Sequence, residues 1–275
     1  MSRLLRNRAA VGGGVVVLAA ALVGLLAPVV APYDPLRVDL SAAWDHPDAR
    51  HLLGADELGR DILSRIIYGS RTSLEIAVVG VTIALALALL IGPPAGFYGG
   101  WLDRLLMRLV DVMLAFPSIL LAIVIIAIIR PGVLSTMLAV GISSVPTFAR
   151  LARGSTLSLR NEEYVTAARA VGATDAHIIG AHILPNLVTP LIVQSTLRLS
   201  TMVLTAAGLS FIGLGVQPPF PEWGTMMSQA RSAIREAPFG ILFPGLALML
   251  VVLGFNLLGD GLRDALDPRD VKQDV

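Results

Sequence analysis

Few residue types in this chain are suited to catalysis or metal binding. There is no cysteine, which excludes disulfides, thiolate metal sites and a cysteine nucleophile. The phosphate-binding pattern G-x-x-x-x-G-K-[ST] is absent, and the single lysine is Lys272. His177 and His182 are five residues apart and would point away from each other on one α-helix. The sequence therefore predicts neither an enzyme nor a metal or cofactor site within this chain.

One polar stripe interrupts an apolar run. Gln194, Arg198 and Thr201 recur at helical spacing within residues 187–214 and share one helix face. A charge at mid-membrane costs about 2.5–3.5 kcal/mol on insertion scales, so Arg198 should face protein or water and not lipid. Two interpretations remain open. The stripe lines a passage for cargo, or Arg198 forms a fixed ion pair with an acidic residue of another subunit.

Such a stripe needs membrane-spanning helices to position it, and the composition favours them. Of 275 residues, 55% are hydrophobic and 15% charged, and mean hydropathy is +0.75. With 21 basic against 20 acidic residues, no basic surface indicates nucleic acid. A bilayer core of roughly 30 Å needs about 20 apolar residues as helix. The sequence predicts an all-α integral membrane protein with six transmembrane helices, within residues 11–31, 74–95, 105–129, 132–149, 187–214 and 239–258.

The basic residues predict how the chain is oriented. The first apolar run follows Arg3, Arg6 and Arg8, and it is longer than the apolar region of a cleaved signal peptide, so we expect a retained anchor. With these arginines in the cytoplasm, counting along the spans places residues 150–186 and both termini there as well. The segment Asp61–Tyr68 is predicted to form a short amphipathic helix on the outer membrane surface.

The polar segment 150–186 is too long to be a mere connector. Residues 162–171 contain strong helix formers with acidic residues at their start, and Gly172 follows as a C-terminal cap. Thr174 can cap a second helix, which Pro185 would end. The sequence therefore predicts a helix, a glycine bend and a second helix.

Small and apolar residues of this segment indicate what it contacts. Ala167 and Ala168 would let another protein approach closely, while Tyr164, Val165 and Ile178 supply apolar side chains for a groove. The alternative is a helical hairpin packed on the chain's own spans. Composition favours neither interpretation.

The run TAARAVGATDAHIIGAHILP resembles the coupling-loop motif in the permease subunits of ABC importers. That motif reads Glu-Ala-Ala, three residues, glycine, nine residues, an apolar residue, any residue, and Leu-Pro. Thr166 stands where glutamate is common, and His182 stands where isoleucine is common. The matching positions are Ala167, Ala168, Gly172, Leu184 and Pro185.

Three further blocks, residues 51–74, 209–231 and 243–269, resemble the C-type permease subunit of dipeptide, oligopeptide and nickel importers. The resemblance implies the type I ABC importer permease fold with both termini in the cytoplasm. It also implies a division of the chain into an N-terminal anchor with an extracytoplasmic segment (1–73), a transporter domain (74–270) with its coupling loop (150–186), and a cytoplasmic tail (271–275).

The same resemblance implies partners and cargo. The partners are a homologous second permease, two ATPase subunits that bind ATP and Mg²⁺, an extracytoplasmic substrate-binding protein, and the lipid of a bacterial inner membrane. Di- and oligopeptides are the expected cargo, with nickel chelates, glutathione or oligosaccharides as alternatives. An ATP-independent channel or a membrane scaffold is the alternative of a different class. The implied ATPase-coupling residues are Glu163, Tyr164, Ala167, Ala168, Gly172, Ile178, His182, Leu184 and Pro185.

Overall fold

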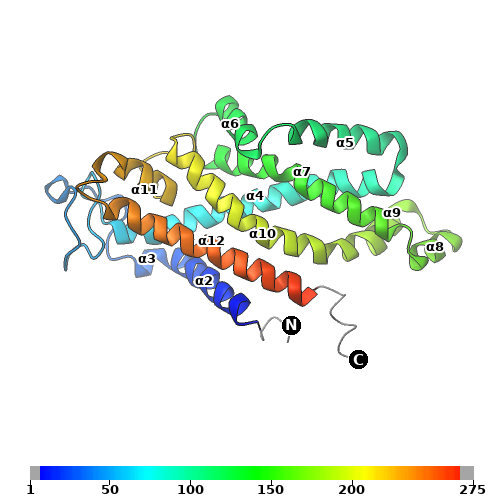
Figure 1. The fold of residues 1–275 in the computed structure, drawn as a ribbon, viewed down its shortest axis with the longest axis horizontal. Helices are drawn as coiled ribbons and strands as arrows, with labels where there is room; N and C mark the ends of the chain where they lie inside the picture. The colour runs from blue at the N-terminus through cyan, green and yellow to red at the C-terminus, as the bar shows by residue number, and fades with distance from the viewer. Residues whose placement is uncertain (1–6, 267–275) are drawn as a thin grey trace.

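The computed structural model describes residues 7–266, which form a helical bundle with no strand in that range (Figure 1). Arg3, Arg6 and the predicted tail 271–275 lie outside the described residues. The longer helices are α2 (Arg8–Leu25), α4 (Ile62–Tyr98), α5 (Gly100–Leu114), α6 (Ser118–Ile129), α7 (Val133–Leu159), α10 (Leu184–Phe211) and α12 (Phe239–Leu266). The short ones are α3 (Ala27–Val30), η1 (Leu40–Ala42), α8 (Glu163–Ala170), α9 (Asp175–His177), η2 (Ile178–Ile183), α11 (Trp223–Gln229) and η3 (Ala230–Ala233).

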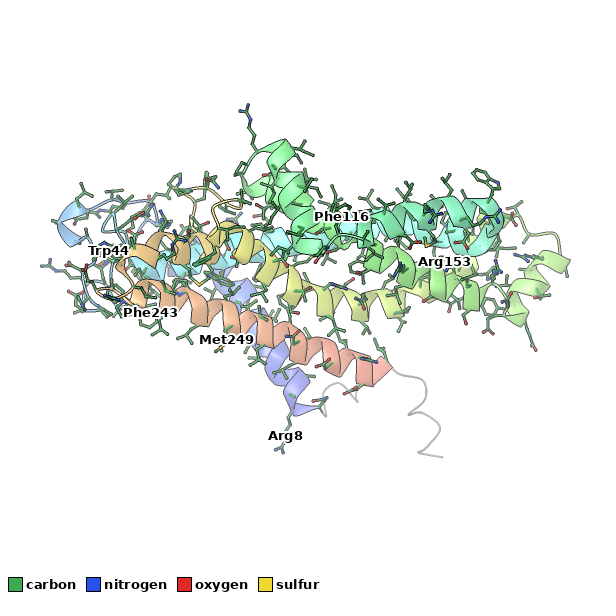
Figure 2. The ribbon with its side chains drawn as sticks, turned by 45° about the horizontal axis from the view of Figure 1, so that its top comes forward. Arg8, Trp44, Phe116, Arg153, Phe243 and Met249 are labelled. Atoms are coloured by element: carbon green, nitrogen blue, oxygen red, sulfur yellow. The ribbon has the colours of Figure 1, made fainter. Side chains whose placement is uncertain are left out.

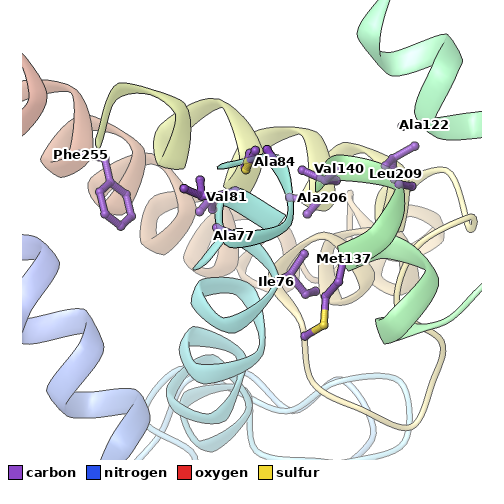
Figure 3. Close-up of a cluster of buried hydrophobic side chains, with 14 of the residues drawn as sticks. Ile76, Ala77, Val81, Ala84, Ala122, Met137, Val140, Ala206, Leu209 and Phe255 are labelled. Atoms are coloured by element: carbon purple, nitrogen blue, oxygen red, sulfur yellow. The ribbon is translucent and has the colours of Figure 1, made fainter. Parts of the chain in front are cut away.

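The helices α4 and α7 form the centre of the bundle. Glycines on their facing sides permit a close approach: a Cβ added at Gly92 would lie 2.7 Å from the Ala149 carbonyl oxygen, and one at Gly141 would lie 2.9 Å from that of Gly80. Small residues have this role in membrane helices because they let backbones come together. Side chains from α4, α7 and α10 then meet in one apolar core (Figure 3).

The bundle has two ends of different construction. We call residues 32–61 and 212–238, together with the first turn of α4 (62–65), the cap, because the two segments connect the helices at one end and pack on that turn. We call residues 160–183 the loop, because they connect α7 to α10 at the opposite end (Figure 1). The helices α4 and α10 extend from one end to the other, so they are the physical link between cap and loop.

Five helices are long and apolar enough to cross a membrane, and a sixth crossing is added if one bent pair counts as a span. This confirms the all-α membrane fold. The third predicted span, residues 105–129, is not one straight helix, because α5 and α6 meet at 90° around Pro117. Proline has no N–H to donate and predicts a kink here. Phe116 marks this sharp junction (Figure 2).

The predicted surface helix Asp61–Tyr68 is also wrong. Asp61 instead caps the start of α4, since its carboxylate accepts the Ser64 N–H at 2.7 Å, and residues 62–68 are the first two turns of that 37-residue helix. Ile62 and Arg65 are fully buried there. Burial excludes contact with lipid headgroups, and the predicted domain boundary at residue 73 falls inside α4.

Candidate functional site

The first helix of the loop ends on a glycine whose backbone requires that residue. Gly172 has φ +85, a conformation that L side chains rarely adopt. The Ala173 N–H donates to the Ala168 carbonyl at 3.0 Å, and the Gly172 N–H donates to that of Arg169 at 3.0 Å, so the last turn of α8 is closed on itself. This confirms the predicted glycine bend.

The second loop helix does not end at Pro185. Thr174 caps it as predicted, accepting the His177 N–H at 3.4 Å, but α9, η2 and α10 form one continuous helix from Asp175 to Phe211. Pro185 is the second residue of α10 and follows η2 almost directly, so the chain stays helical through this proline. The segment η2 is a π-helix, a wider turn that often marks functional sites.

The π-helical turn corrects the expectation for the two histidines. Their ring centroids lie 5.8 Å apart, and the Tyr164 ring lies 6.0 Å from that of His182. Residues five apart diverge on an α-helix, whereas the wider π turn brings them nearer to one face. Within residues 7–266, no group of three or more His, Cys, Asp or Glu side chains is arranged to hold a metal ion.

The loop residues fall into two classes. Val165 and Ile178, both expected to supply apolar side chains for a partner's groove, are instead fully buried and fasten the loop to the bundle. Ala168 and His182 are half-buried. Val171, which sequence reasoning passed over, is 86% exposed and is the most prominent apolar side chain of the loop. The exposed predicted residues are Glu163, Tyr164, Ala167, Gly172, Leu184 and Pro185.

Arginines connect the loop and α7 to the helices α4 and α5. The Arg169 guanidinium lies 5.1 Å from the centre of the Phe97 ring, a cation–π contact. Arg153 binds Asp103 through two hydrogen bonds of 2.5 and 2.6 Å. Such forked pairs fix geometry as well as charge. These contacts join the loop to α4 and α7 to α5.

The predicted polar stripe on α10 splits between two hollows. Arg198 and Thr201 line a small pocket of about 40 Å³ between α6, α7 and α10. Arg198 donates to the Thr147 hydroxyl of α7 at 3.0 Å. Gln194 instead lines a separate groove of about 680 Å³ between α10 and α12, near the loop, together with Arg263. Sequence spacing placed the three on one face, but neighbouring helices divide that face.

The family description "Binding-protein-dependent transport system inner membrane component" matches residues 80–271. A second description, "N-terminal TM domain of oligopeptide transport permease C", matches residues 1–49. The first match alone covers more than half of the chain. The chain belongs to this family of transport permeases.

Curated relatives of the permease match almost its whole length. The dipeptide transport system permease protein DppC of Alkalihalophilus pseudofirmus is 47% identical over 267 residues, covering 97% of this chain and 88% of the relative. The glutathione transport system permease protein GsiD of Pectobacterium atrosepticum is 47% identical over 268 residues, covering 97% and 89%. These relatives support a multi-pass protein of the bacterial inner membrane.

Solved structures share the fold of the permease. An inward-facing conformation of the MetNI methionine ABC transporter superposes with a TM-score of 0.61 at 20% identity, covering 74% of this chain and 96% of that chain. An amino acid ABC transporter structure with histidines superposes with a TM-score of 0.57 at 17% identity, covering 74% and 95%. At these identities the likeness shows the importer permease fold alone.

The cap of the permease contains buried charges that sequence reasoning missed. Arg65 is fully buried, pairs with Asp56 at 3.3 Å and donates to the Pro35 carbonyl at 3.1 Å. Asp56 also binds Arg60 at 2.7 Å. Asp56 and Arg60 flank a turn that Gly59, at φ +70, permits, and a glycine in such a segment is the local signal for the turn. The sequence carries no signal that Arg65 joins them.

A second buried acid stabilises the other half of the cap. Glu222 is fully buried and accepts the Thr225 N–H at 2.9 Å, which caps α11. Burial raises the pKa of this carboxyl, and hydrogen bonds from the Gly224 and Thr225 N–H groups oppose the rise. The neighbouring Trp223 is 1% exposed, and its ring N–H donates to the Ile66 carbonyl at 3.2 Å. The cap is therefore attached directly to the first turns of α4.

Proposed function

We propose that this permease forms half of the translocation pathway of an ATP-driven importer of di- and oligopeptides. The observation that carries the proposal is the loop, a helix-glycine-helix element with exposed small and apolar side chains. Its buried side chains Val165 and Ile178 pack it against the bundle. Family membership and the curated relatives support it. The relative named for glutathione favours one cargo within the same class, because glutathione is itself a tripeptide.

The proposed partners follow from what the chain needs. Its sequence has no phosphate-binding loop, so two separate ATPase subunits would bind ATP and Mg²⁺. A homologous second permease would complete the pathway, and an extracytoplasmic binding protein would deliver the cargo. The loop and both termini then lie in the cytoplasm and the cap lies outside, an orientation that Arg8 at the start of α2 supports.

Coupling would pass through the exposed loop residues. A groove of the ATPase would hold Glu163, Tyr164 and Ala167, while Val165 and Ile178 carry its displacement into the bundle. The half-buried Ala168 and His182 would lie at the edge of that contact. The loop is joined to α10 by an unbroken helix, so its motion would tilt the span that carries the polar stripe.

The pathway would be lined by the polar residues of α10. Arg198 and Thr201 would face the cargo at the level of the small pocket, and Gln194 would do so nearer the loop. A charged side chain within a span is by default a candidate functional residue, because lipid disfavours it.

Co-purification from native membranes in detergent tests the proposal. We expect an ATPase and a second permease to accompany the wild-type chain. Ala167→Leu should lose the ATPase and keep the second permease, because it enlarges only the exposed face of α8. Ser232→Leu, an exposed position in the cap, is the matched control and should keep both. If the wild-type chain purifies alone, the channel or scaffold reading replaces this one.

A further inference from the structure

Arg198 differs from the arginines of the neighbouring helix α7. Arg150 binds Asp111 at 2.7 Å, and Arg153 binds Asp103. Within residues 7–266, no carboxylate lies within 4 Å of Arg198, whose one side-chain partner is the uncharged Thr147 hydroxyl. A guanidinium has five N–H donors in a flat fork, so most of its donors remain available.

The pocket around Arg198 is lined by hydroxyls that are already engaged. Ser143 and Ser144 both donate to the Val140 carbonyl, at 3.1 and 2.9 Å, and Thr205 donates to the Thr201 carbonyl at 2.7 Å. Their oxygens give the pocket a polar wall, while its free donors come from the guanidinium. A group that accepts two parallel N–H bonds, such as a carboxylate, matches this arrangement.

Size and position restrict which part of a ligand can enter. The pocket offers about 40 Å³, against the roughly 10–15 Å³ that a single water needs, so a small group such as a carboxylate fits it. Ser118, the first residue of α6, is part of its wall. The pocket therefore lies beside the 90° break between α5 and α6.

We propose that the Arg198 pocket binds the free C-terminal carboxylate of a peptide in transit. This inference rests on the proposed function and names the chemical group of the cargo that the pathway recognises. It makes the permease itself, and not the binding protein alone, discriminate a free peptide from its C-terminal amide. An uncharged amide cannot accept the charge-assisted pair of hydrogen bonds.

The test compares ATP-driven uptake of one dipeptide in free-acid and amidated form by the complete complex in vesicles. The ratio of the two uptake rates at subsaturating cargo is measured for wild type and for Arg198→Gln. Because the same binding protein serves both variants, its own preference cancels between them. We expect the free-acid preference to fall about tenfold in Arg198→Gln.

Two further variants keep the test decisive. Arg150→Gln removes a guanidinium outside the pocket and should leave the ratio unchanged. Thr147→Val removes the hydroxyl that orients Arg198 but keeps the charge, and it should lower the ratio of free-acid to amide uptake. If Arg198→Gln does not assemble, this variant tests the inference in its place.

Equal losses for both peptides would overturn the inference and identify Arg198 as a fixed partner of the second permease. An unchanged ratio would overturn it too. If the wild-type complex imports neither peptide with ATP, the proposed function fails instead.

Discussion

The cap and the loop lie at opposite ends of one bundle and differ in how far their side chains are buried. In the cap, Arg65, Glu222 and Trp223 are buried and bonded to other segments of the same chain. In the loop, α8 buries only Val165 and leaves its other side chains at least partly exposed. The cap is completed by its own sequence, whereas the loop leaves a surface exposed that an ATPase would cover under the proposed function. Substitutions should therefore lower stability at the cap and activity at the loop.

The largest effect on stability is expected at the centre of the cap. Arg65→Met should lower the free energy of unfolding by about 1–3 kcal/mol, because it leaves the Pro35 carbonyl without its donor while Asp56 keeps only Arg60 as a basic partner. Thermal unfolding in detergent measures this. Arg231→Met, at an exposed cap position, is the control and should melt like wild type. If Arg65→Met melted at the temperature of wild type, the buried charges of the cap would not be what stabilises that end of the bundle.

At the loop, Gly172→Leu should separate stability from activity. A side chain at φ +85 costs about 1–2 kcal/mol, and a Cβ there meets no described atom within 4 Å, so the fold should survive. ATP-driven uptake should nevertheless fall to background, because the bend between α8 and α9 changes. Gly154→Leu serves as the control, since Gly154 has equal space on α7 and no positive φ. Wild-type uptake by Gly172→Leu, with the complex assembled, would refute the coupling role of the bend.

A smaller effect is expected where α5 meets α7. A double-mutant cycle on Asp103 and Arg153 should give a coupling energy of about 1 kcal/mol, because the pair is forked and two-thirds or more shielded. The same cycle on Asp111 and Arg150, whose side chains are 51% and 56% exposed, should give about zero. Equal coupling energies would show that burial does not decide the strength of these pairs.

The smallest effect concerns the pH dependence of the cap. Since burial raises the pKa of Glu222 above its ordinary 4.5, the folded state holds this proton more strongly than the unfolded state. The resulting stability is fully present below pH 4.5 and is lost as pH rises through the higher folded value. Glu222→Gln cannot ionise, so its melting temperature should match wild type at pH 4.5 and exceed it at pH 8. The control Glu236→Gln, at an exposed position, should have the melting temperature of wild type at both pH values. If the melting temperature of Glu222→Gln fell from pH 4.5 to pH 8 as much as that of wild type, this account would be contradicted.

Local patterns predicted the parts of this structure that depend on neighbouring residues. Apolar run lengths gave the spans, and Gly172 with Thr174 gave the bend, because capping is decided within one turn. Pro117 predicted a kink, but not one of 90°, since the direction of α6 is set by its packing on α7. The burial of Ile178 and Arg65 was missed because it depends on segments far away in the sequence.

The unbroken helix from Asp175 to Phe211 also sets a mechanical scale. Its 37 residues, at 1.5 Å each, make a rod of about 55 Å. Turned by about 10° around its middle, such a rod would move its two ends by about 5 Å in opposite directions. A passage beside this helix that became narrower at the loop end would then become wider at the cap end. If this helix lines the proposed passage, its length alone would make the two ends of that passage move in opposite directions.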